Sequence, residues 1–137
     1  MPPPKGVLKE VAPNILNFFK IYEFYEQDPQ YIPFWKGDSQ MLFIAGAEDQ
    51  VCKSVDQAKK AEELMENNGK GNNIKLSIHD GLGHLIDLPF SPPCFLSRHA
   101  LFPRPILIEM GGSDPIKHGK AQEKSWFETI EFFKLHL

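Results

Sequence analysis

Two polar side chains, Asp49 and His84, each follow a predicted strand of this sequence. Active residues of open α/β sheets lie on the loops at the carboxyl ends of the strands. There an acid can orient an imidazole and stabilise its protonated form, while the imidazole takes the proton of a nucleophile. Taken singly, an Asp after a strand is commonly a turn residue, and a His in a glycine-flanked loop is commonly structural. Together, Asp49 and His84 predict the acid and the base of an acyl-transfer site.

The two strands that must position this pair are short, and a helix separates them. Residues 41–46 (MLFIAG) are continuously apolar, which is typical of a strand buried on both faces, whereas residues 74–78 (IKLSI) alternate. Residues 54–68 present one apolar helical face, and Ser54 with Gln57 has the form of a capping box. Strand, helix and strand in this order predict an α/β fold.

Three further elements are predicted outside this unit. Apolar residues at helical spacing indicate a short amphipathic helix over residues 14–25. A short strand is predicted at residues 106–108 within a proline-rich region, and a last helix is predicted to begin with Asp114 as N-cap and Pro115 at its first position. The apolar stripe of this last helix consists of Trp126, Ile130, Phe133 and Leu137.

Composition restricts the partners and the compartment. The chain has 137 residues and a formal net charge of −3, which fits one domain and argues against nucleic acid or an anionic membrane as a partner. Cys52 and Cys94 form no CxxC pair, and no H-x-x-x-H motif or carboxylate cluster indicates a metal site. The sequence lacks an export signal, an apolar stretch of ~20 residues, and a C-terminal Ser-Lys-Leu. We therefore expect a cytoplasmic protein, with a peroxisomal location less favoured.

Three segments carry a resemblance to a known family. Residues 43–49 (FIAGAED) with 52–54 (CKS) look like the acid loop of the type-I acyl-CoA thioesterase and bile acid-CoA:amino acid N-acyltransferase family. Residues 81–94 (GLGHLIDLPFSPPC) are similar to its histidine loop, and residues 111–126 resemble its GG…HA-x-AQ…W signature. Leu88 (usually Pro), Cys52 and Met110 depart from the family pattern.

The resemblance covers about residues 31–137 and implies a fold, a substrate and two site residues. The fold would be the C-terminal portion of an α/β hydrolase, an incomplete, few-stranded and mostly parallel sheet flanked by helices. Residues 1–30 would form a separate proline-rich segment with a short helix. Asp49 would be the triad acid, His84 the general base, and the substrate an acyl-CoA thioester. No cofactor is implied, because coenzyme A enters as part of the substrate.

The nucleophile of such a triad is not found in these residues. In the family it is a Ser or a Cys on a sharp strand–helix turn, but no Ser or Cys here has glycine two positions away on both sides. Cys52 lies three residues after Asp49, but we expect a loop residue there rather than a substitute nucleophile. Because losing the nucleophile removes rate by a factor on the order of 10⁶, we expect the chain alone to be inactive.

Several interpretations therefore stay open. The chain is an acyl-CoA thioester hydrolase that carries only the acid and the histidine, an acyl-CoA:amino acid N-acyltransferase, another α/β hydrolase, or a non-catalytic truncated paralogue or interaction module. Acyl-chain length, the acceptor and the Ser or Cys identity of the nucleophile do not follow from the sequence. A sheet of so few strands exposes an edge, so we also predict self-association.

Overall fold

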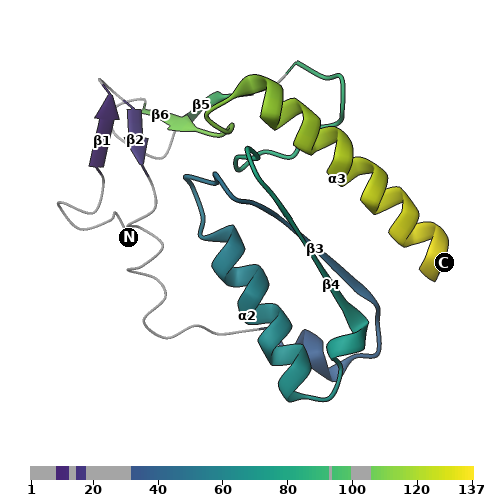
Figure 1. Cartoon of the computed structure of the whole chain (residues 1–137). Helices are drawn as coiled ribbons and strands as arrows, with labels where there is room; N and C mark the ends of the chain where they lie inside the picture. Colours follow the sequence, from purple (N-terminus) through teal and green to yellow (C-terminus); the bar gives the residue numbers. More distant parts are fainter. Residues whose placement is uncertain (1–8, 13–14, 18–31, 93, 100–105) are drawn as a thin grey trace.

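The computed structural model describes residues 9–12, 15–17, 32–92, 94–99 and 106–137. They form an α/β arrangement with a small parallel sheet and two α-helices among the described residues (Figure 1). One sheet has the strand order β1-β2-β6-β5 and the other consists of β3 and β4. The strands are β1 Lys9–Ala12, β2 Ile15–Asn17, β3 Met41–Gly46, β4 Ile74–His79, β5 Leu96–His99 and β6 Ile106–Glu109. The helices are α2 Ser54–Asn67, α3 Pro115–His136 and two 3₁₀ turns, η1 Phe34–Lys36 and η2 Gly71–Asn73.

The parallel β3–β4 pair is the part of the fold that positions the candidate site. Its register runs without interruption from Met41 opposite Ile74 to Gly46 opposite His79. Helix α2 connects the two strands, and Figure 1 shows α2 and α3 on opposite sides of them. The predicted strand–helix–strand unit is therefore confirmed. Residues 41–44 of β3 are nevertheless only half-buried, because β3 has a single described neighbour, and complete burial is reached only at Ala45 and Gly46.

The bounds of α2 agree with the predicted helix, but its start differs from the predicted capping box. Lys53 is the N-cap and contributes no side-chain cap bond. The hydroxyl of Ser54 instead donates to the carboxylate of Asp49, which makes the capping-box prediction wrong. At the other end the chain leaves the helix through Asn68 and through Gly69, whose φ of 72° is easily adopted only by glycine. The buried side chains of α2 are Ala58, Ala61 and Met65.

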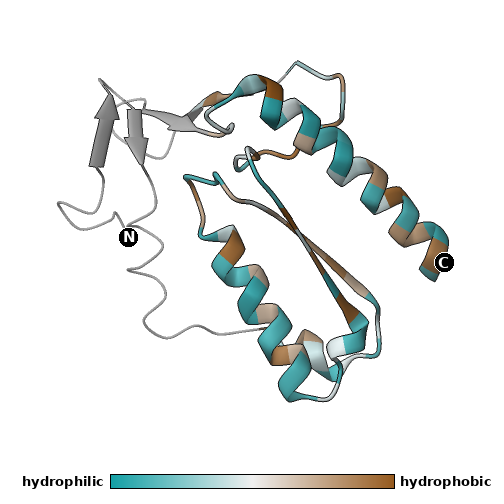
Figure 2. Cartoon of the chain, in the orientation of Figure 1, coloured by the Kyte–Doolittle hydropathy of each residue, from teal (hydrophilic) through white to brown (hydrophobic). Residues whose placement is uncertain are grey.

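Helix α3 begins as predicted, and the face that it buries is not the apolar stripe of the sequence. Asp114 Oδ1 accepts the backbone N–H groups of Ile116 and Lys117, with Pro115 in the first turn. The buried residues are His118, Ala121, Gln122 and Ser125. The apolar stripe is largely exposed: Trp126 is 41% exposed, Phe133 52% and Leu137 99%. Of the stripe only Ile130 is half-buried, and Figure 2 shows hydrophobic positions continuing toward the C-terminal end of α3.

The first sheet contains most of what local patterns did not predict. The predicted helix over residues 14–25 is wrong at Ile15–Asn17, which form β2, while residues 18–25 lie outside the described part of the chain. Strand β2 pairs antiparallel with β1 and parallel with β6, so long-range pairing overrides the local helical period. The predicted strand at 106–108 is confirmed as β6, and β5 was not predicted. Two of the four strand pairings among the described residues are parallel, so this part of the chain is mixed rather than mostly parallel.

The buried core of the described residues lies around the β3–β4 unit. Its apolar members are Ala45, Ala58, Ala61, Met65, Leu82 and Ala121. Neither α2 nor α3 contains a window that is long and apolar enough to cross a membrane, and only the described residues bear on this point.

Candidate active site

Asp49 and His84 meet at the carboxyl ends of β3 and β4. Because the strands are parallel and in register, the loops that follow them leave the same edge of the sheet. His84 Nδ1 lies 3.1 Å from Asp49 Oδ2. The Asp49 side chain is 3% exposed and the His84 side chain 30%. The structure thus brings together the two site residues that the sequence predicted.

The turn after β3 holds the carboxylate of Asp49 from several directions. Oδ1 accepts the backbone N–H groups of Val51 at 2.8 Å and Cys52 at 2.9 Å. Oδ2 accepts the hydroxyl of Ser54, in the first turn of α2, in addition to His84. These donors leave the buried carboxylate little freedom to rotate, so it presents Oδ2 to the imidazole in one orientation.

The other ring nitrogen of His84 is available for chemistry. With Nδ1 directed at Asp49, Nε2 points away from the acid, and within residues 32–92, 94–99 and 106–137 no group hydrogen-bonds to it. In an acyl-transfer triad the acid binds Nδ1 while Nε2 exchanges a proton with the nucleophile. The orientation of His84 matches this division of roles.

Close backbone packing positions the loop that follows β4 and contains His84 (the His84 loop). A Cβ on Gly46 would overlap the carbonyl groups of Leu82 and Gly83, and a Cβ on Gly83 would overlap the backbone of Gly111. Backbone hydrogen bonds reinforce this packing, since Glu48 N–H donates to the Leu82 carbonyl at 2.9 Å. The His84 loop is therefore pressed between the end of β3 and the turn before α3.

Two residues without a predicted role, His118 and Glu48, support this packing. His118 is fully buried, and its Nδ1 accepts the N–H groups of Gly83 at 3.1 Å and Gly112 at 3.2 Å. Glu48 Oε2 accepts the N–H of Ser113 at 2.6 Å, and hydrogen bonding from the side chain and the backbone of Ser113 holds the pKa of Glu48 below its usual value. The only sequence signal for His118 is its place in the segment 111–126 that carries the resemblance; its contacts require the tertiary structure.

A second cluster has the residue types of a triad but not its connectivity. His79 Nε2 lies 2.9 Å from Ser77 Oγ and 3.2 Å from Glu128 Oε2, and Ser77 also donates to Glu128. Because both partners face the same ring nitrogen, the imidazole cannot pass a proton from one side to the other. This buried cluster joins β4 to α3 and is a packing element.

Cys52 does not have the surroundings of a reactive thiolate. Cys52 is a half-buried free thiol, and burial, with a smaller effect of the Asp49 charge, raises its pKa. A raised pKa leaves less thiolate at neutral pH, which makes Cys52 a poor nucleophile. Cys94 is also free and half-buried. The described residues contain no group of His, Cys, Asp and Glu that could hold a metal ion.

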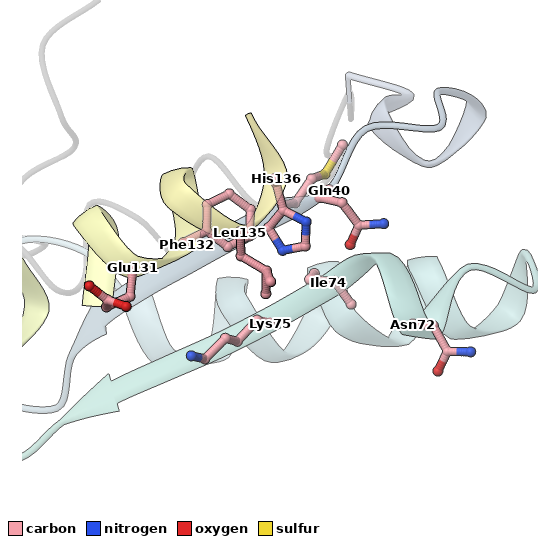
Figure 3. Close-up of a pocket in the computed structure, with 9 residues that line it drawn as sticks. Gln40, Asn72, Ile74, Lys75, Glu131, Phe132, Leu135 and His136 are labelled. Carbon is pink, nitrogen blue, oxygen red and sulfur yellow. The ribbon is translucent and has the colours of Figure 1, made fainter. Parts of the chain in front are cut away.

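A cavity among the described residues lies away from this pair. It has a volume of about 200 Å³ and opens between the beginnings of β3 and β4 and the C-terminal end of α3. Figure 3 shows Lys75 of β4 together with Phe132, Leu135 and His136 of α3 around it. Since Asp49 and His84 follow the opposite ends of the same strands, this cavity is not their substrate site.

Comparison with known proteins relates the chain to one family. A family model described as "BAAT / Acyl-CoA thioester hydrolase C terminal" matches residues 8–137. The chain is 37% identical over 109 residues to rat acyl-coenzyme A amino acid N-acyltransferase 2, covering 80% of this chain and 25% of that protein. It is 33% identical over 132 residues to human bile acid-CoA:amino acid N-acyltransferase, covering 93% of this chain and 30% of the relative.

A thioesterase is among the relatives as well. Human acyl-coenzyme A thioesterase 6 is 35% identical over 106 residues, which is 77% of this chain and 24% of that protein. The chain thus spans about a quarter to a third of the length of the curated relatives it matches. The match over residues 8–137 confirms the family resemblance expected from the sequence: the chain belongs to the BAAT / acyl-CoA thioester hydrolase C-terminal family.

Proposed function

We propose that this chain supplies the acid, Asp49, and the general base, His84, of a nucleophile–His–Asp site that hydrolyses fatty acyl-CoA to fatty acid and coenzyme A. The observation that carries the proposal is the 3.1 Å approach of His84 Nδ1 to a buried Asp49 carboxylate at the ends of two neighbouring parallel strands. The names of the relatives support the substrate class, because they include acyl-CoA thioesterases and acyl-CoA amino acid N-acyltransferases.

The reaction assigns one task to each group. The nucleophile gives its proton to His84 Nε2 and attacks the thioester carbonyl, and Asp49 stabilises the resulting imidazolium. The carbon–sulfur bond then breaks, and His84 returns the proton to the sulfur of coenzyme A. Water next attacks the acyl-enzyme while His84 takes its proton, and the nucleophile recovers that proton as the fatty acid leaves.

The nucleophile is proposed to come from residues other than these 137. No Ser or Cys of the sequence has the flanking glycines of a strand–helix elbow. Ser54 cannot take the role, because its hydroxyl donates to Asp49 rather than facing the imidazole. We accordingly propose that residues 31–137 are the C-terminal portion of an α/β-hydrolase domain that acts in the cytoplasm, with residues 1–30 as a separate segment.

Transfer of the acyl group to an amino acid is the second candidate function. It is favoured by two of the reported relatives, which are named as amino acid N-acyltransferases. The same Asp49–His84 pair would serve, with an amine in place of water in the second step. Glycine and taurine are the acceptors that the family resemblance suggests.

The proposal is tested by completing the site. We would replace the matching quarter of human acyl-coenzyme A thioesterase 6 by this chain and measure release of coenzyme A from palmitoyl-CoA, with and without glycine or taurine. We expect activity in the chimera, a loss of at least 10³-fold in His84→Gln and Asp49→Asn, and background rates for the 137-residue chain alone. His136→Gln, at an exposed position, is the matched control.

Three outcomes separate the candidates. Coenzyme A release that needs no amine supports hydrolysis, whereas release with formation of an N-acyl amino acid supports transfer. A folded chimera without activity, or one that keeps its activity in His84→Gln, contradicts the catalytic proposal. The chain would then be a non-catalytic interaction module.

A further inference from the structure

We propose that His118 is a positioning residue, whose neutral ring holds the backbone before His84 and thereby sets the imidazole of His84 on Asp49. His118 touches neither of these side chains; it acts through the Gly83 amide, one residue before His84. Its effect on catalysis rests on the function proposed above, whereas its effect on the His84–Asp49 hydrogen bond does not.

One ring nitrogen of His118 joins two segments that are distant in sequence. Nδ1 accepts the Gly83 N–H from the loop after β4 at 3.1 Å and the Gly112 N–H from the turn before α3 at 3.2 Å. Both glycines are buried, and these are the hydrogen bonds that their amides make within the described residues. A side chain without an acceptor at this position would leave two buried N–H groups unpaired.

The surroundings of His118 make this support rigid. The residue is fully buried in the first turn of α3, and its ring centroid lies 5.3 Å from that of Phe95. Its own backbone N–H donates to the carbonyl of Asp114, the residue that caps the helix. The acceptor therefore stands on a capped helix, whereas Gly83 belongs to a loop, so the helix determines where the loop lies.

The protonation state of the ring follows from the same contacts. Since two donors face Nδ1, this nitrogen carries a lone pair and the proton resides on Nε2, which has no hydrogen-bond partner among the described residues. Burial lowers the pKa of His118, while the Gly81 carbonyl and the charges of Asp87 and Glu48 oppose that shift. Lys117 is the cation beside it on α3. A proton on Nδ1 would turn the acceptor into a third donor and expel both amides.

The geometry of the His84–Asp49 pair explains why the support of the neighbouring backbone by His118 matters. The His84–Asp49 hydrogen bond is 3.1 Å long, near the upper end of the usual range, so a small displacement of the His84 backbone removes it. Displacements of about 1 Å at a catalytic group can cost on the order of 10² in rate. The Gly83–His118 bond adjoins that backbone directly.

Two substitutions separate the effect of the hydrogen-bond acceptor at position 118 from the effect of the imidazole ring. In His118→Asn the side-chain oxygen takes the place of Nδ1 and cannot be protonated, whereas in His118→Leu the acceptor is lost. In the uniformly ¹⁵N-labelled 137-residue chain we would follow the downfield Nδ1–H proton signal of His84, assigned by its loss in His84→Gln. We would also measure amide exchange at Gly83 and Gly112, with Ala45 and Ile78 of the β3–β4 ladder as references for intact fold.

We expect the His84 signal and slow exchange at both glycines in the parent chain and in His118→Asn. In His118→Leu we expect the signal to be lost and exchange at both glycines to rise at least 10-fold, with the references unchanged. In the parent chain, lowering the pH should raise amide exchange at Gly83 and Gly112 together. In His118→Asn the same change of pH should produce no such joint rise. In the chimera described above, His118→Leu should lower kcat at least 10-fold with little change in KM, and His118→Asn should restore it.

Each alternative result bears on a different claim. A His84 signal that persists in His118→Leu, or one that is lost equally in both variants, overturns the positioning role. If His118→Leu unfolds, the response of the parent chain to low pH decides. If amide exchange at Gly83 and Gly112 does not rise together as the pH falls, the inference fails. Absence of the His84 signal from the parent chain would contradict the His84–Asp49 pair and both proposals, whereas normal NMR results with an inactive chimera would reject only the catalytic function.

Discussion

The hydroxyl of Ser54 donates a hydrogen bond to Oδ2 of Asp49, the same carboxylate oxygen that His84 approaches. Ser54 opens helix α2, so the first residue of the connecting helix is tied to the acid at the end of the preceding strand. The sequence predicts that Ser54 caps helix α2, but its hydroxyl binds the site residue Asp49 instead. This contact links the stability of the α2 start to the orientation of the acid.

Ser54→Ala should therefore weaken both the fold and the site. Loss of one hydrogen bond to a buried carboxylate should reduce the free energy of unfolding by about 1.5–3 kcal/mol. Urea denaturation followed by circular dichroism measures this change. Ser39→Ala, at an exposed position, should shift the midpoint hardly at all; equal effects of the two substitutions would argue against a special role of Ser54.

Gly83→Ala and Gly119→Ala form a matched pair of substitutions that should change the free energy of unfolding in opposite directions. A Cβ at Gly83 would overlap the backbone of Gly111 and Gly112, which cannot move aside, so we expect a loss of several kcal/mol. A Cβ at Gly119 meets nothing within 4 Å inside helix α3, so Ala should add about 0.5–1 kcal/mol. Urea midpoints measure both. A tolerated Ala at position 83 would contradict the tight packing of the His84 loop.

His118 should make stability depend on pH in a defined direction. Burial lowers its pKa in the folded chain below the ordinary 6.5, so the unfolded chain takes up the proton more readily. Its contribution to stability is then complete above about pH 6.5 and declines as the pH falls toward the lowered pKa of the folded state. The free energy of unfolding measured between pH 8 and pH 5 should fall in the parent chain and less in His118→Asn. Identical slopes would show that another group is responsible.

Exposed apolar side chains of α3 should promote self-association of the chain. Phe127 is 56% exposed and Phe133 52%, and β3 has one described strand neighbour. Large exposed apolar side chains and unpaired strand edges favour association between chains. In analytical ultracentrifugation we expect oligomers that diminish in a Phe127→Lys, Phe133→Lys double variant. Ser39→Lys, which adds charge without removing an apolar side chain, should leave them unchanged; a monomeric parent chain would refute this prediction.

Much of the β3–α2–β4 unit follows from the sequence by local rules. The continuous apolar run at 41–46 and the alternation at 74–78 predict their strands, because burial selects side chains with the period of the backbone. Asp114 before Pro115 predicts the start of α3, since cap residues act on amides only two or three positions away. The placement of Asp49 and His84 at one edge then follows from the parallel pairing of consecutive strands.

Other features depend on contacts that no local pattern encodes. Ile15–Asn17 lie in a strand because β6, some ninety residues later, pairs with them. The buried face of α3 contains His118, Gln122 and Ser125 rather than the apolar stripe, since the sheet contacts only one side of the helix.

The sequence by itself determined the local elements, the family resemblance and the order of acid before histidine. Only the tertiary structure decided that Ser54 binds Asp49 and that His118 holds Gly83, because these partners are chosen by three-dimensional proximity rather than by spacing along the chain. A hydrogen bond requires two groups within about 3 Å, and for residues 83 and 118 that distance results from packing α3 against the loop after β4.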